Sequence, residues 1–150
     1  MRIIGCGNRH RGDDAAGILA VERLFARGIA AELCAGEPSE LIEAWRAAED
    51  VVVIDAVVTG APVGTIHVWD AAQPPVFITS AASTHGLGLA QAIELARVMN
   101  SLPPRLRIYG IEGECFETGA TVSPDVDRAV EEVVRRVAAE TALPSGGAAL

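Results

Sequence analysis

The stretch GCGNRHRGDDAAG, residues 5–17, joins a short apolar segment, residues 1–4, to a segment with apolar residues at helical spacing. A glycine-rich turn between a strand and a helix is typical of phosphate-binding loops. This turn instead carries two adjacent carboxylates, Asp13 and Asp14, which would repel a phosphate. A GxGxxG motif would need glycine at His10, and a Walker motif would need Lys and Ser or Thr where the aspartates stand. The hypothesis of a nucleotide-binding domain is therefore supported by the glycines alone.

The composition predicts one globular domain, residues 1–140, followed by a small, glycine-containing and flexible tail, residues 141–150. The net charge of -8 argues against nucleic acid or an anionic membrane surface as a partner. No apolar run reaches the roughly 18 residues that span a bilayer. The three cysteines show no CxxC spacing, and we see no secretory segment. We therefore expect a cytoplasmic protein whose cysteines are small buried side chains.

Short aliphatic runs alternate with segments of helical period, which is typical of βαβ units. We predict a three-layer α/β/α fold, with a twisted, mostly parallel, five-stranded sheet and helices on both faces. The last strand before the third helix follows a turn too short for a helical crossover, so we expect it to be antiparallel. Ser39 and Ser123 are the expected caps of the second and fourth helices. The predicted strands are residues 2–5, 30–34, 51–55, 65–69 and 106–111, the predicted helices are 14–27, 39–48, 87–99 and 124–140, and the run 76–79 is ambiguous.

Three polar side chains follow elements that end or begin at the same edge of this predicted sheet. Asp14 follows the first strand, Asp55 closes the apolar third strand, and His85 lies in a loop that enters the third helix. In open parallel sheets ligands bind in the crevice outside the carboxyl ends of the strands. A carboxylate closing an apolar strand is costly to bury without a partner. We therefore predict that Asp14, Asp55 and His85 converge on one site.

Two carboxylates and an imidazole suit two kinds of chemistry. They are oxygen and nitrogen ligands for a divalent metal such as zinc, nickel, manganese or iron. Alternatively, the carboxylates share a proton, and one of them acts as general base on a water molecule. The residues leave both open, along with a weaker alternative in which Cys6 is a nucleophile beside His85. Aspartates at helix starts are also commonly caps or dipole partners, so one of Asp13 and Asp14 is expected to be structural.

The sequence resembles the hydrogenase maturation proteases, which trim the C-terminal extension from the large subunit of nickel–iron hydrogenases. The order, spacing and context of five motifs agree with that family from about residue 2 to residue 137. The motifs are GCGNRHRGDDAAG (5–17), VVVIDAVVTGAPVGTI (51–66), STHGLGL (83–89), YGIEGE (109–114) and VSPDVDRAV (122–130).

The resemblance implies a phosphorylase/hydrolase-like sheet and an endopeptidase, of aspartic or metal-dependent type, that acts on a hydrogenase large-subunit precursor after nickel insertion. It places the three metal-binding groups on Asp14, Asp55 and His85, with Asp14 and Asp55 as the catalytic carboxylates and Asp13 supporting the helix start. Nickel is expected to arrive with the substrate, with zinc or another divalent metal as the alternative. We expect a monomer. A non-catalytic module that recognises a nickel-loaded partner is the alternative function.

Three features depart from the family pattern. The segment Arg9-His10-Arg11 replaces residues that are mostly apolar in the family, beside the predicted site. In the family a proline often follows the Gly-Ile-Glu of the last strand, and Gly113 stands at that position here. The second acidic residue that often follows the central aspartate is absent after Asp55. None of these departures removes a predicted metal ligand, but together they affect which substrate protein the chain would bind.

Overall fold

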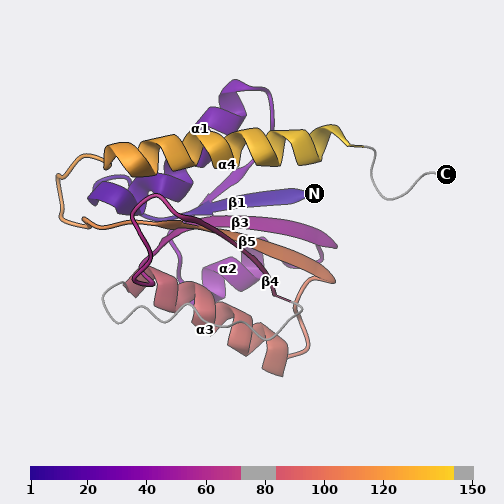
Figure 1. Cartoon of the computed structure of the whole chain (residues 1–150). Helices are drawn as coiled ribbons and strands as arrows, with labels where there is room; N and C mark the ends of the chain where they lie inside the picture. The colour runs from indigo at the N-terminus through magenta and orange to yellow at the C-terminus, as the bar shows by residue number, and fades with distance from the viewer. Residues whose placement is uncertain (72–83, 144–150) are drawn as a thin grey trace.

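The computed structural model describes residues 1–71 and 84–143, except for the side chains of residues 84–87. Its elements are β1 (Arg2–Cys6), η1 (Gly12–Ala15), α1 (Ala16–Ala26), β2 (Glu32–Cys34), α2 (Pro38–Ala44), β3 (Asp50–Val57), β4 (Ile66–Asp70), α3 (Thr84–Val98), β5 (Arg105–Glu112) and α4 (Pro124–Ala142). The strands form one five-stranded sheet in the order β2-β1-β3-β5-β4. Helices α1 and α4 lie on one face of the sheet, and α2 and α3 lie on the other (Figure 1). The predicted three-layer α/β/α architecture is confirmed.

The centre of the sheet is the valine-rich strand β3. It pairs in parallel with β1 and with β5, and every residue from Val51 to Val57 is buried. A strand covered on both faces is expected to have a continuous run of apolar residues, and β3 has such a run up to Asp55. Strand β4 pairs antiparallel with β5, with Ile66 opposite Ile111. The antiparallel strand predicted from the short turn is therefore confirmed.

Alternation along β3 divides the interior into two cores. Val53 and Val57 belong to the core under α2 and α3, whereas Val52 and Ile54 belong to the core under α1 and α4. Because successive side chains of a strand point to opposite faces, Asp55 lies on the α2–α3 side. The α2–α3 core also contains Leu41, Ile42, Trp45, Leu89 and Ile93, and the α1–α4 core contains the stripe of α4, Val126, Val130, Val133, Val134 and Val137.

Several helix boundaries differ from those predicted. The first helix begins with the 3₁₀ turn η1, and α2 begins with Pro38 in its first turn, so Glu37 rather than Ser39 holds the N-cap position. Ser123 does hold the N-cap position of α4, but its side chain makes no capping bond. Helix α4 continues to Ala142, two residues into the predicted tail. The ambiguous run 76–79 and residues 144–150 lie outside the described residues.

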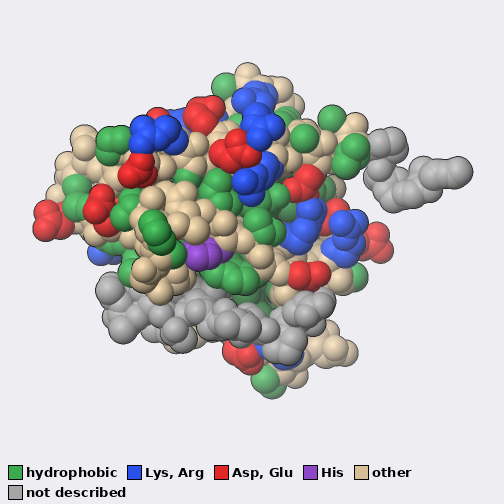
Figure 2. All heavy atoms as spheres, viewed as in Figure 1, with side chains coloured by type: hydrophobic (Ala, Val, Ile, Leu, Met, Phe, Trp, Pro, Cys, Tyr) green, Lys and Arg blue, Asp and Glu red, His purple; other side chains and the backbone are tan. Residues whose placement is uncertain are grey.

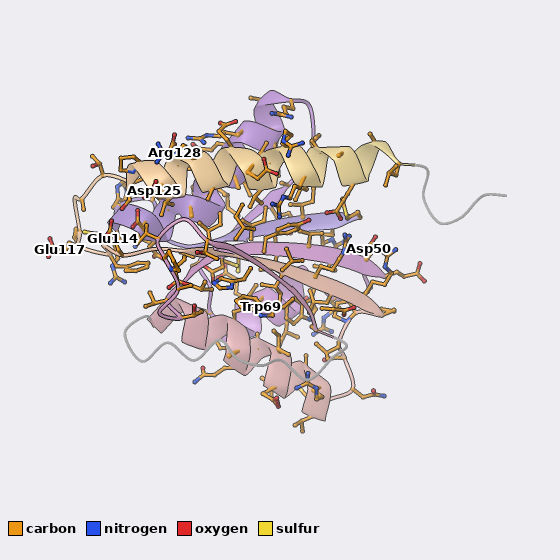
Figure 3. All side chains as sticks on the ribbon, in the orientation of Figure 1. Asp50, Trp69, Glu114, Glu117, Asp125 and Arg128 are labelled. Carbon is orange, nitrogen blue, oxygen red and sulfur yellow. The ribbon has the colours of Figure 1, made fainter. Side chains whose placement is uncertain are left out.

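The carboxyl ends of β1, β3 and β5 meet at one edge of the sheet because the three strands are parallel. Helices α3 and α4 both begin at this edge, which is at the left in Figure 1. Glu114 and Glu117, in the loop between β5 and α4, lie at the same edge, and Asp50 lies at the opposite one (Figure 3). This carboxyl edge is where ligands bind in open α/β sheets.

The surface mixes charges of both signs. Figure 2 shows acidic and basic side chains interspersed over the visible face, including that of α4. Arg128 pairs with Asp125 on this helix, and Arg135 and Arg136 both pair with Glu132. In the described part of the chain, no helix combines the length and apolar character needed to cross a membrane.

Gly17 lets α1 pack directly on the sheet, and this contact yields a testable prediction. A Cβ atom added to Gly17 would lie 2.3 Å from the carbonyl oxygen of Cys6 in β1 and 2.5 Å from that of Ile54 in β3. Gly17→Ala must therefore push α1 away from both strands. We expect the free energy of unfolding in urea to fall by about 2 kcal/mol, since overpacking outweighs the gain in helix propensity.

Gly28→Ala is the matched control for this change. A Cβ atom at Gly28 would meet nothing within 4 Å, although its φ of +81° disfavours alanine. We expect a loss of only about 1 kcal/mol there, from the backbone conformation alone. Wild-type stability in Gly17→Ala would contradict the close packing of α1 on β1 and β3.

Candidate functional site

The turn between β1 and η1 folds back on Asp14. The N–H of Asn8 donates to the carbonyl oxygen of Asp14 over 3.1 Å, and the N–H of Asp14 donates to the carbonyl oxygen of Arg11 over 3.0 Å. Gly7 has a φ of +139°, and a Cβ atom there would lie 2.0 Å from the carbonyl oxygen of Asp14. Only glycine fits such a conformation and approach. The glycine-rich stretch thus brings a carboxylate to the carboxyl edge of the sheet.

The side chain of Asp14 is fully buried within η1. Burial raises the pKa of Asp14 to about 7, while the positive charge of Arg11 and a hydrogen bond from the backbone of Asn8 act in the opposite direction. Removal from water disfavours the charged form of a carboxyl group, and here that effect is the larger one. Asp14 therefore changes its protonation state close to neutral pH.

Asp55 is fully buried near the carboxyl end of β3. Its Oδ1 accepts a hydrogen bond of 2.8 Å from the N–H of Ala56, and its Oδ2 has no hydrogen-bond partner among the described residues. Burial raises the pKa of Asp55 well above its ordinary value, and the negative charge of Asp14 raises it further. Asp14 loses its proton first, and its charge then opposes the ionisation of Asp55.

The structure brings two of the three predicted site residues together. Asp14 lies in η1, which follows β1, Asp55 lies near the end of β3, and the charge of Asp14 acts on Asp55. His85 lies in the first turn of α3 rather than in a loop, and its side chain is outside the described residues. The start of α3 does lie at the carboxyl edge, because a Cβ atom at Gly88 would be 2.3 Å from the carbonyl oxygen of Gly36, just after β2.

The carboxyl pair suits proton transfer and cation binding. Two buried carboxyls with raised pKa values provide one group that titrates near pH 7 beside another whose neutral form is favoured by burial. Oδ2 of Asp55 is a buried oxygen without a hydrogen-bond partner in the described part of the chain, so the pair also fits a divalent cation. Among the side chains that the structure describes, no group of three or more metal ligands gathers. A third ligand would have to come from elsewhere, and His85 is the sequence-based candidate.

Asp13 lies in the first turn of η1, and its carboxylate makes its hydrogen bonds outside this turn. Its carboxylate is fully buried and accepts hydrogen bonds from the loop between β5 and α4. Oδ2 accepts from the N–H of Glu114 at 2.9 Å, the N–H of Cys115 at 3.2 Å and the hydroxyl of Ser123 at 2.8 Å. Oδ1 accepts from the N–H of Ser123 at 2.7 Å. Asp13 therefore ties η1 to a distant loop.

Glu112 is a further buried carboxylate, and the sequence prediction did not single it out. It closes β5, and its oxygens accept hydrogen bonds from the N–H and hydroxyl of Thr59 at 2.7 Å each, and from the N–H of Gly60 at 3.2 Å. Nε2 of His67 in β4 is 3.0 Å from Oε1 of Glu112. Glu112 thereby anchors the turn between β3 and β4. The signal was present in YGIEGE, because an acidic residue closes an apolar strand there as Asp55 does in VVVIDA.

The segment Arg9-His10-Arg11 is largely engaged within the chain. Arg9 forms an ion pair with Glu22 of α1. His10 is exposed. Nε of Arg11 donates to the carbonyl oxygen of Phe116 over 3.2 Å, and its charge acts on Asp14. The departure from the family pattern therefore connects the edge of the site to the β5–α4 loop.

Cys6 and Cys34 are small buried side chains, as expected, whereas Cys115 is only half-buried. Cys6 and Cys34 lie opposite each other on β1 and β2, and both are free thiols in the α2–α3 core. A hydrogen bond with Cys34, together with burial, raises the pKa of Cys6 well above its ordinary value. A thiol that stays protonated is a poor nucleophile. The alternative in which Cys6 attacks a substrate is therefore disfavoured.

Sequence and fold are both similar to known proteases. The family model HycI, hydrogenase maturation protease, matches residues 35–140. The chain is 28% identical over 144 residues to the hydrogenase 2 maturation protease of Escherichia coli K12, which covers 91% of this chain and 87% of that protein. The solved hydrogenase maturating endopeptidase HybD from E. coli superposes with a TM-score of 0.75 at 27% identity, over 93% of this chain and 91% of that chain. A second solved endopeptidase from E. coli superposes with a TM-score of 0.80 at 25% identity, over 95% of both chains.

The family match covers more than half of the chain, including β3 with Asp55, the start of α3 and β5 with Glu112. The relatives and solved structures extend the similarity over nine tenths of the chain. The chain therefore belongs to the hydrogenase maturation protease family, and it is a peptidase.

Proposed function

We propose that the chain is an endopeptidase that removes the C-terminal extension of a nickel–iron hydrogenase large-subunit precursor after nickel insertion. The observation that carries the proposal is the buried pair of Asp14 and Asp55, with raised pKa values, at the carboxyl edge of a fold shared with hydrogenase maturation proteases. The protein acts in the cytoplasm, as a monomer, on a protein substrate rather than on nucleic acid or membrane.

The carboxyl pair would supply the proton transfers of peptide hydrolysis. Asp14 titrates near neutral pH, so its ionised form accepts a proton from the water whose oxygen attacks the scissile carbonyl carbon. The same proton passes to the amide nitrogen as the carbon–nitrogen bond breaks. Asp55, which holds its proton to higher pH, orients the water or the carbonyl oxygen by hydrogen bonding. Proton transfer of this kind contributes about 10²–10⁴-fold to rates.

Nickel is part of the proposed substrate, because it is inserted into the precursor before cleavage. Asp14, Asp55 and His85 are the residues that would contact it, or hold zinc or another divalent ion in its place. An ion bound there would polarise the scissile carbonyl or the attacking water. The oxygen donors of the carboxyl pair suit such an ion, and Oδ2 of Asp55 is buried and ready to accept a contact.

Cleavage of a nickel-loaded precursor tests the proposal directly. We expect mass spectrometry to show that wild-type protein shortens the precursor from its C-terminus, and that nickel-free precursor stays intact. Asp14→Asn, Asp55→Asn and His85→Ala should each abolish the mass loss while the circular dichroism spectrum stays unchanged. Glu117→Gln, which alters an exposed carboxylate at the same edge, should process normally.

Two results would contradict the proposal in different ways. Normal maturation by a variant with all three site residues replaced would show that the chemistry lies elsewhere. If the wild-type protein bound the nickel-loaded precursor but left its mass unchanged, the chain would act as a binding module and not as the processing enzyme for that substrate.

A further inference from the structure

The turn that carries Asp14 has little stability of its own. η1 is a single 3₁₀ turn of four residues, and no side chain caps it. Its internal bonds run from the N–H of Asp14 to the carbonyl oxygen of Arg11 and from the N–H of Ala16 to that of Asp13. Short 3₁₀ segments have poor hydrogen-bond geometry and depend on contacts from outside. The position of Asp14 therefore depends on what η1 touches.

The outside contact is the loop between β5 and α4, and Asp13 makes most of it. Besides the four hydrogen bonds that its carboxylate accepts, its N–H donates to the carbonyl oxygen of Cys115 over 2.8 Å. The two segments touch so closely that a Cβ atom on Gly113 would lie 2.8 Å from Cβ of Asp13. Bonds to an ionised acceptor are roughly twice as strong as neutral ones. Asp13 is thus a multiply bonded anchor between segments about a hundred residues apart.

The position of Asp14 needs support from other residues, because burial of its carboxyl group is energetically unfavourable. Its carboxyl group is fully buried at the edge of the sheet where the fully buried Asp55 also lies, and burying a polar group costs free energy. A turn free to move would relax by carrying Asp14 toward water and away from Asp55. The hydrogen bonds of the adjacent residue oppose that movement.

We propose that Asp13 is a positioning residue, whose hydrogen bonds to Glu114, Cys115 and Ser123 hold η1 in the place that keeps Asp14 beside Asp55. The same bonds fix the β5–α4 loop, whose exposed Glu114 and Glu117 border the carboxyl edge (Figure 3). Asp13 acts through Asp14 and touches neither the substrate nor the reacting atoms. The kinetic part of this inference rests on the proposed function.

Asp13→Asn, compared with Glu112→Gln, tests the inference. Both changes turn a buried carboxylate with four hydrogen-bonding contacts to three residues into an amide. We expect both variants to lose stability in urea. Only Asp13→Asn should lower kcat for precursor cleavage, by about 10²-fold with KM within about twofold, because displacement of a catalytic group by about 1 Å has that effect.

Amide hydrogen exchange supplies a readout independent of activity. Exchange at Asp14 and Ala16 should rise more than about tenfold in Asp13→Asn, beyond any rise at the core strands, and should stay at the core level in Glu112→Gln. Equal loss of kcat in both variants, or unchanged exchange and kcat in Asp13→Asn, would overturn the inference. If the wild-type protein leaves the precursor uncut, the proposed function fails, and hydrogen exchange still decides whether Asp13 holds Asp14 in place.

Discussion

Asp55→Asn is expected to abolish precursor processing and, at pH 8, to raise the free energy of unfolding by about 1–2 kcal/mol. Burial and the neighbouring charge of Asp14 raise the pKa of Asp55, so its ionised form destabilises the fold. The folded state holds this proton to a higher pH than the unfolded chain does, and the penalty therefore appears as pH rises. An amide carries no charge at any pH. Urea denaturation with a chelator, at pH 5 and pH 8, measures the effect.

The gain should shrink at pH 5, because the raised pKa of Asp55 makes the penalty for its ionisation smaller at lower pH. Glu117→Gln removes an exposed carboxylate from the same edge of the sheet and should change the free energy of unfolding by less than about 0.5 kcal/mol at both pH values. A destabilised Asp55→Asn protein at pH 8 would mean that the carboxylate is stabilised by contacts, and that its role is structural.

Asp14→Asn should change how stability depends on pH. The pKa of Asp14 is raised from its ordinary value to about 7, mainly by burial. Between about pH 4 and pH 7 the folded protein binds more protons at this group than the unfolded chain, so the contribution of Asp14 to wild-type stability falls as pH rises. The Asp14→Asn variant has no carboxyl group at this position, so this pH-dependent loss of stability is absent from it. Its stability relative to wild type should grow across that window by an amount on the order of 2–4 kcal/mol.

The difference between the two unfolding curves isolates Asp14, because all other titrating groups are shared. Thermal or urea unfolding at half-unit steps from pH 4 to pH 8, with a chelator present, gives that difference directly. A constant offset across the range would show that Asp14 titrates as an ordinary exposed carboxyl group. An offset that decreases with pH would show instead that the ionised form is stabilised in the fold.

Both predictions follow from the way hydrogen bonds are distributed among four buried acidic residues. Asp13 and Glu112 each have four hydrogen-bonding contacts, and they hold loops around the carboxyl edge. Among the described residues, Asp55 has a single hydrogen-bond partner, the N–H of Ala56, and it lies beside Asp14. Well-bonded carboxylates stabilise a fold, whereas poorly bonded ones are retained at functional sites at the expense of stability.

The position of Asp55 was predictable from the sequence because it depends on local pattern. A run of valines and isoleucine marks a strand buried on both faces, and an acidic residue closing such a run must lie at the edge where parallel strands end. The same pattern applies to Glu112, so its burial could also have been predicted. The hydrogen-bond partners of Glu112 could not, since Thr59 and Gly60 lie more than fifty residues earlier in the chain.

The sequence by itself determined the alternation of strands and helices, the parallel centre of the sheet and its antiparallel edge strand, because periodicity and turn length are local properties. Tertiary structure decided which of two adjacent aspartates does what. Asp13 is bonded to residues 101 to 110 positions away, while Asp14 is buried beside Asp55. Burial and hydrogen-bond partners of this kind exist only when distant segments pack together, and they set the pKa on which the chemistry depends.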